Sequence, residues 1–418
     1  MLPIYKEITK QVKTPCYVFD TNELKKRVTY LKNNLPDNVN LCFALKANPF
    51  LATSLKNMVN KFELCSYGEY KIAANSGIKP AQMVVSGVYK NYEELKEIIS
   101  LKEPKILITI ESLNQLDMIE KIGQELKITI KVLLRLTSNN QFGLSKNEVI
   151  KILENRYSYQ YLNIIGLHYF SGTQHFLLKH IKKDIDYIDE FLTELKNNLG
   201  YLAEELELGL GLPVSYFKEE KEVEIADNYI EETKVIDDEE IITENDVQKK
   251  EREFLTSVSS YLKSMTYQGH ITLELGRSIS SSCGTYLTKV VDLKNNAAGN
   301  FAIVDGGINH ITYYGQMMAM KHPEVLLYPT RKGKTESYNI CGSLCTINDI
   351  LVKDLEVSNI KIGDILAFKR VGAYAMTEGI SLFLSRDLPN VVLINDNHIE
   401  VVRNDVKTYP LNMARKEK

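Results

Sequence analysis

Eight short runs rich in Val, Ile and Leu alternate with helical patterns between residues 22 and 277, and this alternation constrains the fold most. The runs cover 40–46, 63–66, 83–87, 105–110, 128–136, 164–170, 205–209 and 271–277. Between them, segments such as 92–99 and 147–153 repeat apolar residues at helical spacing. Strands that are almost continuously apolar are buried on both faces, as in parallel sheets. Eight such strands with intervening helices predict an α/β fold, a closed (β/α)8 barrel of the TIM type.

After about residue 280 the pattern changes to short β-like stretches separated by Gly, Asn and Asp. These stretches lie at 286–291, 301–304, 364–368 and 390–394. They predict a second, C-terminal all-β domain over residues 281–418.

One segment interrupts the barrel region, which we assign to residues 25–280. Residues 218–252 are dense in Glu, Asp and Lys and contain few aromatic residues. We interpret this segment as a solvated insertion or a disordered loop. The alternative is an acidic arm that covers the active site or contacts a partner.

The composition fits a globular chain and argues against nucleic-acid and membrane partners. A length of 418 residues, with 44% hydrophobic and 25% charged residues, suffices for two domains with sizeable cores. The formal charge of −3 and the pI near 6.2 provide no basic field for nucleic acid. No apolar run approaches the ~20 residues of a membrane-spanning helix.

The N-terminus and the cysteines indicate the compartment. The first residues lack an apolar signal core followed by a cleavage site, so we expect a cytoplasmic protein. The six cysteines form no CxxC pair and have no histidine cluster at zinc spacing. We therefore expect free thiols and no metal site.

Polar residues and glycines end four of the predicted strands, at the end of a barrel where active sites lie. They are Lys46 at the first run, His168 and Ser171 at the sixth, Gly209 and Gly211 at the seventh, and Glu274, Gly276 and Arg277 at the eighth. A lysine that ends an apolar strand is unfavourable unless it is used. Its chemical use is an amine that forms an imine with a carbonyl compound. Each residue alone also has an ordinary structural explanation, such as a core histidine or a glycine that turns a loop.

Together these residues meet the requirements of pyridoxal 5′-phosphate (PLP). This cofactor needs a Schiff-base lysine, a phosphate cradle of glycine N–H groups and an acid that faces the pyridine nitrogen. Lys46, the two glycines and Glu274 supply these parts, and Glu274 would make the ring an electron sink. His168 would stack on the ring, and Arg277 or Tyr374 would complement the phosphate charge.

The order and spacing of several motifs resemble the fold-type III PLP decarboxylases, which include diaminopimelate, ornithine and arginine decarboxylases. The matching segments are Ala44-Leu-Lys-Ala-Asn, Ser66-Tyr-Gly-Glu, Gly166-Leu-His-Tyr-Phe-Ser-Gly, Leu208-Gly-Leu-Gly, Glu274-Leu-Gly-Arg, Cys341-Gly-Ser-Leu-Cys-Thr-Ile-Asn-Asp and Gly372-Ala-Tyr. They span nearly the whole chain outside the acidic segment. The resemblance implies a barrel, a β-domain that also includes residues 1–24, and a head-to-tail homodimer with active sites at its interface.

The same resemblance implies roles for individual residues. Lys46 binds PLP, His168 stacks on it and Glu274 faces its ring nitrogen. The residues around the phosphate are Ser171, Gly209, Gly211, Gly276, Arg277 and Tyr374. Cys345 matches a cysteine that reaches in from the partner subunit and protonates the carbanion after carbon dioxide leaves. One departure is Leu210, which replaces the middle glycine of the usual phosphate loop.

Two further departures concern the substrate, an amino acid or its derivative. Diaminopimelate members of the family have an acidic residue directly after the catalytic cysteine and an arginine near the start of the β-domain. This chain has Thr346 and Tyr313 at these positions. The far end of diaminopimelate would lose roughly 1 to 3 kcal/mol per missing partner. Free ornithine or lysine is also disfavoured, because its distal ammonium would lack the acid.

The pair Cys345-Thr346 and the segment 383–389 are similar to a subgroup of decarboxylases that act on conjugated amino acids. That subgroup includes siderophore-pathway enzymes acting on citryl-diamino acids and an enzyme acting on glutamate held by a carrier protein. The leading prediction is therefore a citryl-diamino acid such as N-citrylornithine. The candidate substrate contacts are His310, Tyr313, Tyr314, Thr346 and Asp349, and each is equally compatible with ordinary β-domain structure.

Three alternatives stay open. The first is a decarboxylase of free ornithine, lysine or diaminopimelate, or of a carrier-bound amino acid. A racemase is disfavoured because the related racemases use a tyrosine opposite the lysine, where this chain offers Cys345. A noncatalytic regulator that retains the fold is disfavoured because the cofactor residues are all present.

Overall fold

The chain forms two compact units in the computed structural model. The structure describes residues 2–100, 106–217, 246–313, 318–396 and 398–414. One unit comprises Val28–Pro213 and Lys221–Gly276, and the other comprises Met1–Arg27, Val214–Glu220 and Arg277–Lys418. No helix among the described residues is long and apolar enough to cross a membrane.

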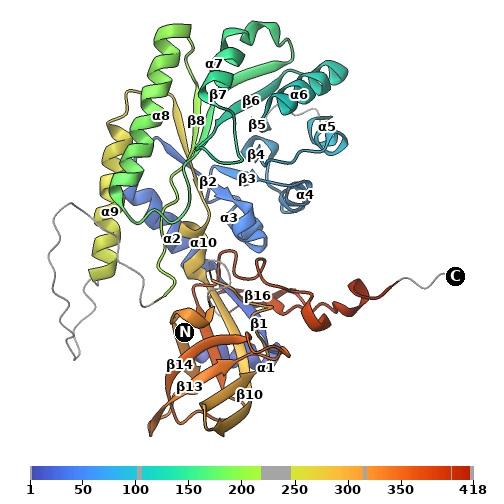
Figure 1. Ribbon diagram of the computed structural model, residues 1–418, viewed down its shortest axis with the longest axis vertical. Helices are drawn as coiled ribbons and strands as arrows, with labels where there is room; N and C mark the ends of the chain where they lie inside the picture. The colour runs from blue at the N-terminus through green and yellow to red at the C-terminus, as the bar shows by residue number, and fades with distance from the viewer. Residues whose placement is uncertain (1, 101–105, 218–245, 314–317, 397, 415–418) are drawn as a thin grey trace. The chain divides into compact units, whose positions relative to one another are not determined.

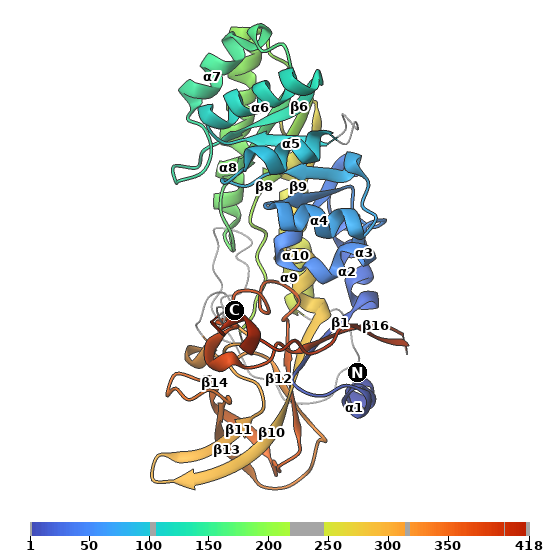
Figure 2. The same cartoon turned by 90° about the vertical axis from the view of Figure 1, so that its right-hand side faces the viewer.

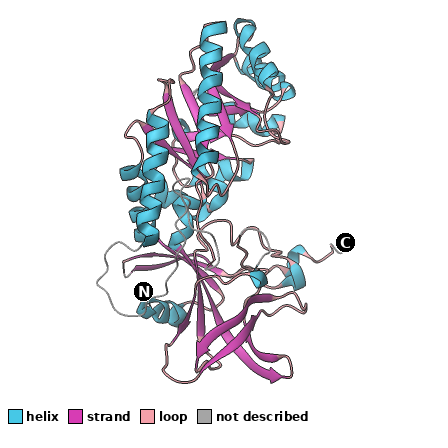
Figure 3. Cartoon of the chain, turned by 60° about the vertical axis from the view of Figure 1, so that its left-hand side comes forward, coloured by secondary structure: helices cyan, strands magenta, loops and turns pink. Residues whose placement is uncertain are grey.

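Eight strands close the first unit into a parallel barrel, as predicted (Figure 1). They are β2 (Val39–Ala44), β3 (Lys61–Leu64), β4 (Met83–Val85), β5 (Leu107–Ile110), β6 (Ile130–Leu136), β7 (Leu162–Phe170), β8 (Glu205–Gly209) and β9 (His270–Leu275). Every residue of β4 and β5 is buried, as expected for strands covered on both faces. Figure 3 shows these strands in magenta with the cyan helices around them.

Four predicted runs, 40–46, 63–66, 83–87 and 271–277, extend past the observed strands, because their last residues belong to the next turn, loop or helix. Lys46 lies in a 3-10 turn, Leu45–Ala47, directly after β2. Ser66 caps α4 (Tyr67–Asn75), where its Oγ accepts a hydrogen bond from the backbone N–H of Glu69. Arg277 begins the short helix α10 (Arg277–Ser280) after β9. The carboxyl ends of these strands therefore carry the polar residues.

The helices of the barrel unit connect successive strands. They are α3 (Ala52–Leu55), α4, α5 (Tyr92–Ser100), α6 (Leu113–Leu126), α7 (Lys146–Glu154), α8 (Leu178–Leu199) and α9 (Asp246–Lys263), and α2 (Thr21–Asn34) spans the boundary of the two units. Figure 1 shows α8 in green and α9 in yellow side by side.

Helix α9 includes residues 246–252, which the sequence placed in the acidic insertion. The helix buries Phe254, Leu255 and Val258 on one face. This apolar face accounts for the ordered helix. The remaining part of the insertion, residues 218–245, lies outside the described residues.

The second unit is built on a mixed sheet of nine strands, which confirms the predicted fold class. Its strands are β1 (Cys16–Asp20), β10 (Gly284–Asn296), β11 (Gly299–Val304), β12 (Val325–Tyr328), β13 (Thr335–Cys341), β14 (Ile350–Ser358), β15 (Ile365–Lys369), β16 (Asn390–Asn395) and β17 (His398–Arg403). The main path runs β14-β13-β11-β10-β1-β16-β17, while β15 pairs with β10 and β12. Figure 2 shows β10 and β11 as a long hairpin.

Segments from both ends of the chain share this sheet. Strand β1 pairs antiparallel with β10 and parallel with β16. Helix α1 (Leu2–Gln11) packs Tyr5, Ile8 and Val12 into the same apolar cluster as Val18 and Leu287. The N-terminal segment is thereby held by burial of apolar side chains.

Candidate active site

Lys46 lies between two buried carboxylates at the carboxyl end of the barrel strands. Its Nζ donates a hydrogen bond to Oε2 of Glu63 and another, at 3.2 Å, to Oε1 of Glu274. Strand β2 pairs with β3 on one side and β9 on the other, and these strands carry Glu63 and Glu274. Only 3% and 4% of the two glutamate side chains are exposed, so the lysine provides the positive charge that they need.

Glu274 also contacts His168 on β7. His168 Nε2 lies 3.3 Å from Oε2 of Glu274, and the imidazole is buried. Burial raises the pKa of Glu274, but the Lys46 ammonium and the His168 hydrogen bond outweigh burial and hold this pKa below its ordinary value. The carboxylate is therefore ionised at neutral pH.

Three further side chains surround Glu63. Ser86 Oγ donates to Oε1 of Glu63, and Cys65 Sγ donates to the same oxygen at 3.0 Å. Cys65 Sγ also lies 3.5 Å from Lys46 Nζ. Burial raises the pKa of the Cys65 thiol, with the charge of Glu63 as the second cause. Cys65 is thus a neutral donor beside the lysine.

The two loops that follow β7 and β8 contact each other and contain the predicted phosphate-binding glycines. Ser171 donates to the carbonyl of Gly209 through its N–H at 3.1 Å and through its Oγ at 3.3 Å. A Cβ at Gly209 would lie 2.2 Å from Phe170 Cδ2. Gly211 has a φ of +60°, and a Cβ there would lie 2.4 Å from the carbonyl oxygen of Gly172. Both positions therefore require glycine, while Leu210 between them is buried. Gly276 follows directly after β9.

Arg277 and Tyr374 belong to the second unit and contact each other. The guanidinium carbon of Arg277 lies 4.3 Å from the centroid of the Tyr374 ring. Arg277 Nη1 also donates to Tyr216 Oη at 3.4 Å. The contacts to Tyr374 and Tyr216 hold the Arg277 guanidinium in place within the second unit.

Cys345 lies exposed in the loop between β13 and β14. Asp349, in the same loop, is buried, and its carboxylate accepts hydrogen bonds from the backbone N–H groups of Ile308 (2.8 Å) and Leu344 (2.7 Å). Thr346 is partly exposed beside the cysteine. Asp349 therefore shapes the loop that presents Cys345.

His310 and Tyr313 lie in the interior of the second unit. His310 Nε2 is 3.0 Å from the Asp387 carbonyl oxygen, and Nδ1 is 3.2 Å from Tyr286 Oη. Burial lowers the pKa of His310 to about 4, so the imidazole is neutral at pH 7. Tyr313 is 1% exposed and donates its hydroxyl to the Lys369 carbonyl. These contacts give both side chains structural roles, and Tyr314 lies outside the described residues.

Comparison with known proteins identifies the family. Residues 21–280 match the model of the pyridoxal-dependent decarboxylase, pyridoxal binding domain. The chain belongs to the pyridoxal-dependent decarboxylases. Its cofactor is PLP, and the enzyme is an amino-acid decarboxylase, a carboxy-lyase.

Similar proteins span nearly the whole decarboxylase chain. It is 25% identical to the diaminopimelate decarboxylase of Aquifex aeolicus over 415 residues, which cover 95% of this chain and 90% of that protein. It is also 25% identical to the L-glutamyl-(BtrI acyl-carrier protein) decarboxylase of Niallia circulans, covering 95% and 92%. The crystal structure of the Helicobacter pylori diaminopimelate decarboxylase complexed with L-lysine has a TM-score of 0.79 at 23% identity and covers 97% of this chain and 98% of that chain. This likeness supports the fold.

The barrel residues of this decarboxylase fit PLP. The site combines an amine with a buried carboxylate, which are the groups that the Schiff base and the ring nitrogen of PLP require. His168 Nδ1 is buried without a hydrogen-bond partner in the described residues, which leaves a polar atom for a ligand.

Sequence reasoning missed Glu63, Cys65 and Ser86. The predicted site residues were polar residues at strand ends. Glu63 was not among them because it lies within the apolar run Phe62-Glu63-Leu64. An acid inside a buried strand is as unfavourable as the lysine that ends one, unless it has a partner. That signal was available in the sequence.

All six cysteines are free thiols, as predicted.

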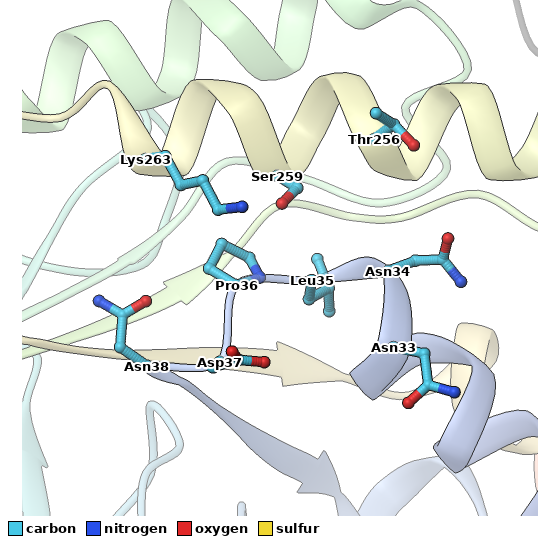
Figure 4. Close-up of a pocket in the computed structure, with 9 residues that line it drawn as sticks. All are labelled: Asn33, Asn34, Leu35, Pro36, Asp37, Asn38, Thr256, Ser259 and Lys263. Atoms are coloured by element: carbon cyan, nitrogen blue, oxygen red, sulfur yellow. The ribbon is translucent and has the colours of Figure 1, made fainter.

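A cavity of about 540 Å³ in the barrel unit lies away from the lysine site (Figure 4). Its lining comes from the segment before β2 and from α9 and consists of Asn33, Asn34, Leu35, Pro36, Asp37, Asn38, Thr256, Ser259 and Lys263. Asn38 immediately precedes β2, so this cavity lies at the amino end of the barrel strands. The lysine site lies at the carboxyl end.

Proposed function

We propose that this decarboxylase acts on an amino acid whose far end is already conjugated, with a citryl-diamino acid such as N-citrylornithine, in carboxylate siderophore biosynthesis, as the leading substrate. The observation that carries this proposal is the loop of Cys345. Asp349 is the single acid in residues 341–350, and its carboxylate already accepts hydrogen bonds from two backbone N–H groups. Thr346 follows the cysteine where diaminopimelate enzymes have an acid. A free distal ammonium would therefore lack a carboxylate in this loop.

Tyr313 gives a second argument. It occupies the position at which diaminopimelate enzymes have an arginine for the distal carboxylate. Its ring packs 5.6 Å from each of the rings of Tyr216 and Phe217, and burial raises the pKa of its hydroxyl well above the ordinary value. The Tyr313 side chain is thus neutral and offers no positive charge for the distal carboxylate of diaminopimelate. A conjugated far end, in which the amine has become an uncharged amide, does not need the acid either.

The barrel residues divide the work at the cofactor. PLP, when bound, withdraws electrons from the substrate Cα and so allows the α-carboxylate to leave as carbon dioxide. Lys46 would bind the cofactor, and Glu274, ionised and in contact with His168, would keep the ring nitrogen protonated. His168 would pack on the ring face. Ser171, Gly209, Gly211 and Gly276 of the barrel would hold the phosphate, and the family resemblance assigns Arg277 and Tyr374 to the phosphate as well.

Cys345 supplies the proton that replaces carbon dioxide at Cα. Its exposed position in a loop fits a donor that works in the active site of a second copy of the chain. We therefore propose a homodimer in which each subunit lends Cys345 to the other. Within the dimer this loop would become buried around the substrate.

Two specific observations favour other substrates. The Aquifex aeolicus relative is a diaminopimelate decarboxylase, which makes diaminopimelate the first competitor. The Niallia circulans relative acts on a glutamyl group attached to an acyl-carrier protein, which is also a conjugated amino acid. Free ornithine and lysine complete the alternatives.

Carbon dioxide release by the PLP-loaded enzyme tests the proposal. The substrates are N-citrylornithine, carrier-bound glutamate, meso-diaminopimelate, ornithine and lysine. We expect kcat/KM for the citryl conjugate to exceed the others by at least about tenfold, equivalent to about 1.4 kcal/mol. A preference for a free diamino acid would refute the conjugate proposal and leave the decarboxylase assignment intact.

A pair of loop variants sharpens the same experiment. Thr346→Glu restores an acid directly after Cys345, so it should raise activity on free diamino acids. Asn348→Glu adds the same charge at an exposed position two residues further along the loop and should not. If the two variants raise this activity equally, the added negative charge acts by long-range attraction of the substrate and not by direct contact with its distal ammonium.

A further inference from the structure

A second buried carboxylate lies beside Lys46, and the proposed chemistry gives it no role. Glu63 is 3% exposed, and its Oε2 accepts a hydrogen bond from Lys46 Nζ. Its Oε1 is held by two neutral donors, Ser86 Oγ and Cys65 Sγ. With one oxygen fixed by these donors, the other is directed at the lysine.

The two carboxylates around Lys46 are not equivalent. Glu274 contacts both Lys46 and His168, and under the proposed function it serves the ring nitrogen when PLP is bound. A cationic ring nitrogen then competes with the lysine for Glu274. Glu63 faces the lysine from strand β3, the neighbour of β2 on the other side, and contacts Ser86 and Cys65 there.

We propose that Glu63 is a positioning residue that holds the Lys46 ammonium whenever the lysine is not bonded to the cofactor. The proposal rests on the proposed function to the extent that Lys46 is the PLP-bearing lysine. Glu63 keeps Nζ beside β3 while the cofactor is absent or engaged with substrate, so the lysine stays close enough to return. The charge of Glu63 is what performs this task.

This role has a measurable consequence for cofactor loading. An amine must be unprotonated to bond a carbonyl carbon, and a carboxylate within hydrogen-bond distance favours the ammonium. Removing the Glu63 charge should allow PLP to bond Lys46 at lower pH. The pH at which half of the protein is loaded should fall by about one to three pH units.

The other titratable groups near this pair remain in place when Glu63 alone is changed. Those that interact with Lys46 or Glu63 are Cys42 on β2, Cys65 after β3, Glu69 on α4, Lys90 after β4, Glu207 on β8 and Glu274 on β9. His168 on β7 contacts Glu274. A shift between the parent and a Glu63 variant therefore reports on the Glu63 charge.

The experiment mixes PLP with the apoprotein across a range of pH and follows the visible absorbance of the bound cofactor. Glu63→Gln should lower the loading midpoint, and Glu63→Asp, which keeps the charge, should stay closer to the parent. Glu205→Gln is the matched control, because Glu205 pairs with a different lysine, Lys61 on β3. It should leave the midpoint unchanged.

The outcomes separate the two proposals. Glu63→Ala also removes the charge and decides the matter if Glu63→Gln does not fold, as judged by thermal unfolding. A folded Glu63→Gln or Glu63→Ala protein with the parent midpoint overturns the positioning role. If the parent chain itself does not load PLP at any pH, it is the proposed function that fails.

Discussion

Lys46 Nζ lies 3.2 Å from Oε1 of Glu274, and this contact decides the charge of a buried acid. Burial on its own raises the pKa of Glu274, whereas the lysine and His168 together reverse that effect. An ionised carboxylate at this position is what a protonated ring nitrogen requires. The lysine thus keeps Glu274 in the ionised state that its proposed role at the ring nitrogen requires.

Lys46→Ala should invert the contribution of Glu274 to the pH dependence of stability in the apoprotein. In the parent chain the folded-state pKa of Glu274 lies below its ordinary value, so its contribution is present above about pH 4.5 and is lost as the pH falls through the folded pKa. Without the lysine, burial dominates and raises the pKa. The variant should then gain stability, relative to the parent, as the pH falls from about 7 to about 5.

Urea unfolding of the apoprotein at several pH values measures this difference. Lys71→Ala is a suitable control, because Lys71 pairs with Glu97 at the exposed surface, where little change is expected. Parallel stability curves for the parent and Lys46→Ala proteins would contradict the prediction. The same variant should lack the visible absorbance band of bound PLP.

Cys345→Ala should reduce decarboxylation far more than cofactor binding, because a proton donor acts only after PLP and substrate are bound. General acid catalysis contributes about 10²–10⁴-fold, so we expect a loss of kcat of that order. PLP affinity, measured by absorbance titration, should stay near the parent value. Cys341→Ala, four residues earlier and partly buried, is the control and should retain activity. Equal losses of affinity and kcat in Cys345→Ala would rule out the proton-donor role.

Asp349→Ala should destabilise the protein without changing substrate preference. The substitution removes the acceptor for the Ile308 and Leu344 N–H groups, at a cost of about 1–3 kcal/mol for each buried donor left unpaired. Thermal or urea unfolding measures this loss. The ratio of kcat/KM for N-citrylornithine to that for diaminopimelate should match the parent ratio. A large change in this ratio would instead make Asp349 a substrate contact.

The barrel could be predicted from sequence because each of its strands and helices is marked by a pattern within a short stretch of the chain. Each strand is a short apolar run between helical patterns, and every predicted run overlaps one observed strand. The lysine, the histidine and Glu274 followed from the same reading, since charged or polar groups at strand ends meet at one end of a barrel. Glu63 did not, because its partner Lys46 comes from another strand and the pairing is visible only in the register of β2 and β3.

The interior of the second unit was harder to predict. His310 and Tyr313 follow β11 in a polar, turn-like stretch, which reads as a surface loop. They are buried because distant segments cover them: His310 contacts Tyr286 and the Asp387 carbonyl, and Tyr313 contacts the Lys369 carbonyl. Such burial depends on contacts between residues far apart in sequence, which periodicity does not report.

Glu207 provides a last test of the barrel electrostatics. It lies on β8 with no exposed surface, its Oε1 is 3.7 Å from Cys42 Sγ, and its Oε2 has no hydrogen-bond partner in the described residues. Burial, followed by the charge of Glu274, raises its pKa from 4.5 to about 8. The folded protein therefore keeps this proton at pH 7, whereas the unfolded chain does not.

The sign of the effect follows from linkage. The stabilising contribution of protonated Glu207 is fully present below pH 4.5 and is lost as the pH rises towards about 8. Glu207→Gln, which mimics the protonated acid, should remove this loss. The unfolding free energy of the parent should fall relative to the variant by up to about 1.4 kcal/mol per pH unit in that window. Glu204→Gln, at an exposed neighbouring position, should follow the parent curve. If Glu207→Gln and the parent lose stability equally between these pH values, Glu207 is ionised in the folded barrel and has a cationic partner after all.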